Sequence, residues 1–127
     1  MLRRSESGKV SELKIDKDCF VDRWWMENHT ELIVCECQKR KITVESIKKC
    51  NSKRKGYHLY IKIKPAIDSN LANFLQWLFG DDARRVGFNR ARIESGLLEW
   101  NKLFEIPCRR LRTIYRGDGE NNHGKSG

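Results

Sequence analysis

The chain has 127 residues, of which 39% are hydrophobic and 34% are charged, and its formal net charge is +9. This length suits one domain with a single core. No stretch approaches the roughly 20 apolar residues that span a bilayer, and no apolar segment follows the basic N-terminus as in a secretory signal. Five cysteines, an odd number, suit a reducing compartment better than a secreted disulfide framework. We therefore expect a cytoplasmic protein without a membrane partner, and the positive charge favours nucleic acid as the partner.

Both ends of the chain lack the apolar residues that would stabilise an ordered structure. We expect residues 1–9 to be flexible and residues 116–127, which are rich in glycine and asparagine, to be disordered. The residues between them, 10–115, are expected to form a single α+β domain.

The first half of this domain reads as β-strands. Alternating or β-prone residues predict strands at 11–15, 19–26, 31–37, 41–47 and 56–64. The segment 31–37, "ELIVCEC", is apolar on both faces, which is typical of a central strand covered on both sides. On that strand Cys35 and Cys37 would share a face, and we expect buried free thiols there rather than zinc ligands. Asp16, Lys17 and Asp18 are expected to form a turn.

The second half changes to a helical period. Asp68 or Ser69 can cap a first helix, and Gly80 is a natural C-terminal stop. Asp81 or Asp82 can start a second helix that ends near Gly96, and residues 97–104 predict a shorter third one. The fold class is therefore α+β: an antiparallel sheet of about four to five strands in the N-terminal half, with two to three C-terminal helices packed on one face.

The predicted strand at 56–64 separates its side chains by period two. Apolar residues alternate with His58, Tyr60, Lys62 and Lys64, which would lie on the open face. Aromatic rings and ammonium groups on one sheet face are typical of surfaces that bind single-stranded nucleic acid. An ordinary solvated polar face has the same alternation, so this strand alone does not distinguish the two.

Basic residues are concentrated in the predicted hairpin 38–64, where Glu45 is the only acid. Like charges at this density repel one another, which an anionic partner would compensate. In the helix predicted to begin at Asp81 or Asp82, three arginines form a second candidate phosphate-binding surface. The residues that we expect to contact nucleic acid are Lys53, Arg54, Lys55, His58, Tyr60, Lys62, Arg84, Arg85 and Arg92.

Residues 52–61, "SKRKGYHLYI", resemble the second motif of archaeo-eukaryotic primase–polymerases, and most closely its version in the polymerase domains of bacterial end-joining ligases. In that family the motif lies on a hairpin and binds the nucleotide triphosphate. The resemblance implies that Ser52, Lys55 and His58 contact phosphates and that Gly56 lets the backbone approach them.

The family also places two Mg²⁺-binding carboxylates two residues apart on a preceding strand. Here the segment 31–37 offers only Glu36, the pair Asp16 and Asp18 is predicted in a turn, and Asn89 stands in the middle of the arginine-bearing helix. We therefore expect no cofactor, and the sequence leaves it open whether the protein is an enzyme, although the missing acids argue against catalysis. Mg²⁺ bound at Glu36 is expected only if the protein is an enzyme.

The sequence thus predicts a small basic nucleic-acid-binding protein, and its size and resemblance imply a replication protein of archaeal or viral type. Two alternatives remain open. One is a degenerate or minimal primase–polymerase-like nucleotidyltransferase, and the other is a basic adaptor that binds an acidic protein.

Overall fold

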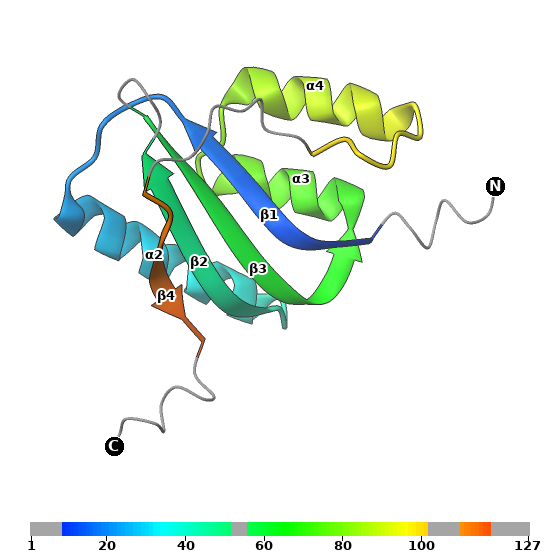
Figure 1. Ribbon diagram of the computed structural model, residues 1–127. Helices are drawn as coiled ribbons and strands as arrows, with labels where there is room; N and C mark the ends of the chain where they lie inside the picture. Colours follow the sequence, from blue (N-terminus) through cyan, green and yellow to red (C-terminus); the bar gives the residue numbers. More distant parts are fainter. Residues whose placement is uncertain (1–8, 52–55, 102–109, 118–127) are drawn as a thin grey trace.

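The computed structural model describes residues 9–51, 56–101 and 110–117. Its elements in chain order are β1 (Lys9–Lys17), α2 (Arg23–Lys39), β2 (Thr43–Asn51), β3 (Tyr57–Asp68), α3 (Ser69–Leu78), α4 (Ala83–Glu94) and β4 (Arg112–Arg116). The strands form one sheet in the order β1-β3-β2-β4, with every neighbouring pair antiparallel (Figure 1). The predicted α+β class with an antiparallel sheet is confirmed.

The connection between β1 and β2 explains the position of α2. Both strands run antiparallel to β3, which lies between them, so β1 and β2 are parallel to each other. Parallel strands need a crossover connection, which is usually a helix. The arrangement is a split β-α-β unit, in which β3 fills the gap left by the crossover.

The hydrophobic core lies between one face of this sheet and helices α2 and α3. It includes Leu13 and Ile15 of β1, Ile47 of β2, Leu59 and Ile61 of β3, Ile33 of α2 and Leu75 of α3. Helix α4 packs mainly on α3, where the Asn73 side-chain amide donates a hydrogen bond to the Val86 carbonyl at 3.1 Å. The other face of the sheet carries no helix in the described part of the chain (Figure 1). We call it the outer face.

The predicted limits of α3 and α4 are confirmed by their caps. The Asp68 carboxylate accepts a hydrogen bond from the Asn70 amide at 3.0 Å, and Asp82 accepts one from Arg84 at 3.0 Å. Gly80 and Gly96 follow the two helices with φ of 101° and 83°. Glycine adopts these positive φ values without steric cost, so both helices end where the sequence indicates.

The strands predicted at 19–26 and 31–37 are wrong, because most of these residues belong to α2. The Asp22 carboxylate caps the helix by accepting a hydrogen bond from the Trp25 amide at 2.9 Å. Its buried residues, Met26, Ile33 and Cys37, are separated by seven and four positions, as on one side of a helix. Leu32 is 43% exposed, so the segment is not covered on both sides.

The helical geometry also separates the two cysteines predicted to share a strand face. Cys37 is buried, whereas Cys35 is exposed, and both are free thiols. Burial raises the pKa of the Cys37 thiol to about 11, which makes it unreactive. Cys19 is also free, but Cys50 is disulfide-bonded, contrary to the expectation of reduced thiols.

The C-terminal part of the sheet differs from the prediction as well. Residues 112–116 form β4 against β2, a pairing that the sequence did not predict. Residues 97–101 are not helical, and the rest of the predicted third helix lies outside the described residues. Most of the two predicted flexible ends, 1–9 and 116–127, also lies outside them. None of the described helices is long and apolar enough to span a membrane.

Candidate nucleic-acid interface

The outer face of the sheet brings basic side chains from three strands around one tyrosine. In the strand register, Tyr60 of β3 lies between Lys14 of β1 and Lys48 of β2. Lys62, two residues along β3, points to the same side and is exposed, as is Lys48. Tyr60 and Lys14 are partly exposed. The candidate interface therefore contains the predicted residues Tyr60 and Lys62 and also Lys14 and Lys48. The last two lie beside Tyr60 because of the strand pairing.

His58 lies on the same face, one pair further along the strands, but it is buried. Its side chain is only 7% exposed, and its Nε2 lies 3.3 Å from Oδ1 of Asp16, its register partner on β1. The ring also meets Tyr60 edge-on, with centroids 6.5 Å apart. His58 is therefore positioned to orient Asp16 and Tyr60 rather than to stack on a base.

The turn predicted at Asp16, Lys17 and Asp18 is wrong for its first two residues, which belong to β1. Asp16 lies beside His58, so an acid and the histidine of the primase-like motif are neighbours in the sheet. Asp18, two residues after Asp16, lies just beyond the end of β1. In the described part of the chain, no three His, Cys, Asp or Glu side chains are gathered as a metal site.

Glu36, the acid that the sequence placed on a strand, lies on α2 instead. Its carboxylate forms ion pairs with Lys39 at 3.2 Å and with Arg40 at 2.9 Å. Hydrogen bonds from Arg40 and then Lys39 lower the pKa of this carboxyl group. Glu36 is on the helical layer and not on the outer face, so it is not part of the interface.

The three arginines of α4 that the sequence predicted as nucleic-acid contacts occupy different environments. Arg84 is exposed, as a phosphate-binding residue requires. Arg92 is partly buried, where it donates to Asn89 Oδ1 at 3.3 Å and lies over the Phe88 ring. The Arg85 side chain is only 10% exposed and pairs with Asp81 at 2.6 Å. Arg85 is thus engaged inside the protein, and we do not include it in the interface.

A buried polar network explains this use of Arg85. Its guanidinium also donates to the Lys14 carbonyl at 3.2 Å and to Asn101 Oδ1 at 2.9 Å. Asp81 Oδ1 accepts the backbone amide of Asp16 at 2.9 Å. Burial raises the pKa of Asp81, although Arg85 acts in the opposite direction. The network ties α4 to the free edge of β1.

Several residues predicted to bind phosphate lie in the basic loop 52–55, which the structure does not describe. Ser52, Lys53, Arg54 and Lys55 lie outside the described residues. Gly56 has a structural explanation, since a Cβ there would collide with the Lys17 carbonyl oxygen of β1. The close backbone approach predicted at Gly56 is thus made to a neighbouring strand.

Comparison of this chain with protein-family models, with curated proteins and with solved structures found no match.

Proposed function

We propose that the protein binds nucleic acid on the outer face of its sheet. The observation that carries the proposal is the position of Tyr60 between Lys14 and Lys48, with Lys62 beside it. An aromatic ring can stack on a base while the surrounding ammonium groups contact phosphates, an arrangement that favours single strands. The net charge of +9 supports a polyanionic partner.

The proposal predicts the salt dependence of binding. Lys48→Ala and Lys62→Ala should each weaken binding and reduce the slope of log K against log salt by about one, because each removes one phosphate contact. Tyr60→Ala should cost about 1–3 kcal/mol, as expected for one lost base stack. Fluorescence anisotropy with labelled single-stranded DNA and RNA over a salt series measures all three.

Lys39→Ala is the matched control, since Lys39 is an exposed lysine at the end of α2 on the helical layer. It should leave affinity and slope unchanged. Binding that is independent of salt, or equal for Tyr60→Ala and the unmodified protein, would contradict the proposal. Specific binding to an acidic protein in place of nucleic acid would favour the adaptor alternative.

One observation favours a second function, nucleotidyl transfer of the primase–polymerase type. Asp16 lies 3.3 Å from His58, the histidine of the resembling motif, and Asp18 follows two residues later. Two carboxylates at this spacing are suitable Mg²⁺ ligands, and Mg²⁺ would supply charge stabilisation to a reacting phosphate. This assignment replaces Glu36 with Asp16 and Asp18.

Primer extension tests this second function. The unmodified protein should incorporate nucleotides with Mg²⁺ or Mn²⁺, and Asp16→Asn should lower the rate by at least about 100-fold if the metal site is lost. Glu36→Gln is the control, because Glu36 is far from His58 in the fold, and it should retain the activity. Absence of incorporation by the unmodified protein would eliminate this function.

A further inference from the structure

A second candidate site lies away from the outer face, in a cavity between the start of α2 and the neighbouring strands β2 and β4. Its volume is about 680 Å³. Ligand sites usually have about 300–1,000 Å³, so a mononucleotide-sized molecule would fit. The sequence did not indicate this site, because its walls come from three segments that only the fold brings together.

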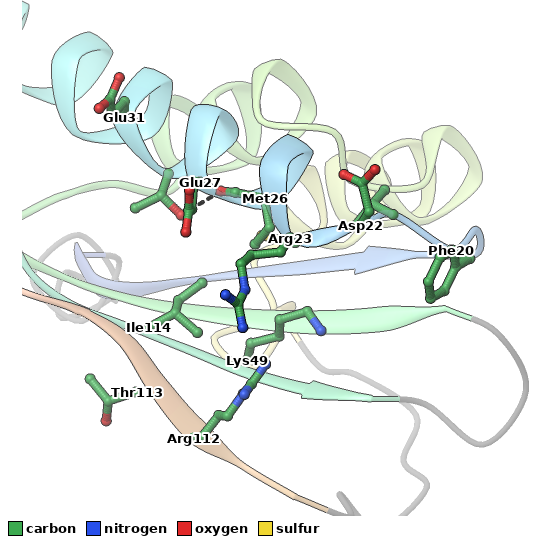
Figure 2. A pocket seen from close by; sticks show the side chains of 12 residues that line it. Phe20, Asp22, Arg23, Met26, Glu27, Glu31, Lys49, Arg112, Thr113 and Ile114 are labelled. Carbon is green, nitrogen blue, oxygen red and sulfur yellow. Dashed lines mark hydrogen bonds between the residues drawn. The ribbon is translucent and has the colours of Figure 1, made fainter.

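Three cations from three different elements meet in this cavity. Figure 2 shows Arg23 reaching from the first turn of α2 toward the strands, where Lys49 of β2 and Arg112 of β4 lie. Lys49 and Arg112 are register partners. Burial and then the neighbouring charge of Arg112 lower the pKa of Lys49. Like charges gathered in this way repel one another unless an anion binds between them.

The carboxylates of Asp22, Glu27 and Glu31 also line the cavity, but none of them forms an ion pair with these cations. Lys49 donates to the neutral Asn51 amide oxygen at 2.9 Å and lies 5.8 Å from the Tyr57 ring centroid. No ion pair joins Arg23, Lys49 or Arg112 to a carboxylate within the described ranges.

The cavity is also polarised and has an aromatic side chain in its wall. Glu27 and Glu31 line it further along α2, so a carboxylate lies beyond the three cations. Phe20, in the segment before α2, is 78% exposed. The carboxylates can accept hydrogen bonds from hydroxyl or amino groups. A ligand with a phosphate at one end and such donors at the other would match this arrangement.

We propose that this cavity binds a nucleoside phosphate, with its phosphate group between Arg23, Lys49 and Arg112. The site is separate from the nucleic-acid interface and does not depend on it. The phosphate accepts charge-assisted hydrogen bonds from the two guanidinium groups, which bind it bidentately. The nucleoside extends from the phosphate along α2 toward Glu27 and Glu31, whereas Phe20 lies at the opposite end of the cavity (Figure 2).

Calorimetric titration with adenosine 5′-monophosphate, adenosine and inorganic phosphate tests the proposal. The monophosphate should bind at least about tenfold more tightly than either other compound. Arg23→Gln and Arg112→Gln should each weaken its binding by about tenfold or more, as expected for lost hydrogen bonds between charged groups. Arg116→Gln, which changes another exposed arginine of β4, should have no effect.

The outcomes separate this site from the proposed interface. Lys62→Ala should weaken nucleic-acid binding but not binding of the monophosphate. Equal affinities for adenosine and its monophosphate would overturn the proposal, as would inorganic phosphate binding as tightly as the monophosphate. It would also be overturned if Arg23→Gln and Arg112→Gln, with native circular dichroism, bound the monophosphate normally.

Discussion

Replacing Arg85 with methionine is expected to lower the free energy of unfolding by about 3–5 kcal/mol, because it leaves a buried carboxylate without its cation. The Asp81 side chain is fully buried, and its distance to the Arg85 guanidinium is 2.6 Å. The same substitution removes the hydrogen bonds of Arg85 to the Lys14 carbonyl and to Asn101. Equilibrium unfolding in urea measures the loss.

Two further variants isolate the cause. Arg84→Met changes the neighbouring, exposed arginine and should alter stability by no more than about 0.5 kcal/mol. Asp81→Asn combined with Arg85→Met should be more stable than Arg85→Met alone, because no buried charge remains while the asparagine oxygen can still accept the Asp16 amide. A similar small effect for Arg85→Met and Arg84→Met would contradict the structural role of Arg85.

The loss of unfolding free energy caused by Arg85→Met should also depend on pH. The folded-state pKa of Asp81 is raised above its ordinary value, so the folded protein binds this proton more tightly than the unfolded chain. Stability from this group therefore falls as pH rises from the ordinary pKa to the folded one. Loss of Arg85 raises the folded pKa further. The stability loss caused by Arg85→Met should therefore be smaller at pH 5 than at pH 7. A loss that grows on acidification would disprove the link between Arg85 and the protonation of Asp81.

Ile33→Ala should cost about 2–5 kcal/mol, whereas Leu32→Ala should cost no more than about 0.5 kcal/mol. Ile33 is fully buried in α2 and packs in the core, while its neighbour Leu32 is 43% exposed. Truncating Ile33 leaves a cavity that the rigid sheet cannot fill. The midpoints of urea unfolding curves compare the two variants directly.

This pair of variants also distinguishes the helix from the strand predicted by the sequence. A central strand covered on both sides would bury Leu32 and Ile33 on opposite faces, so both truncations would be costly. The helix buries only Ile33. Comparable losses for Leu32→Ala and Ile33→Ala would therefore contradict the structure of α2.

The features that could be predicted from the sequence are those with local causes. The alternation from Tyr57 to Lys64 indicates a strand with one buried face, because side chains alternate in any extended chain. Asp68 and Asp82 cap their helices through amides only two residues away. Gly80 and Gly96 supply backbone conformations that other residues rarely adopt.

Helix α2 shows where local preference fails. The adjacent tryptophans Trp24 and Trp25, and the run around Ile33, favour a strand by composition. Burial against the sheet determines the outcome instead, because a crossover between the parallel strands β1 and β2 needs a helix. That requirement is a property of the topology, which no single segment contains.

The candidate sites divide in the same way. The sequence by itself determined the basic charge, the local caps and the face of β3 that carries Tyr60 and Lys62. Only the tertiary structure decided that Lys14 and Lys48 flank Tyr60, that Asp16 lies beside His58, that Arg85 is buried, and that Arg23, Lys49 and Arg112 share a cavity. Strand pairing and helix packing bring together residues far apart in the chain. The local periodicity of a segment does not specify which other segment it packs against.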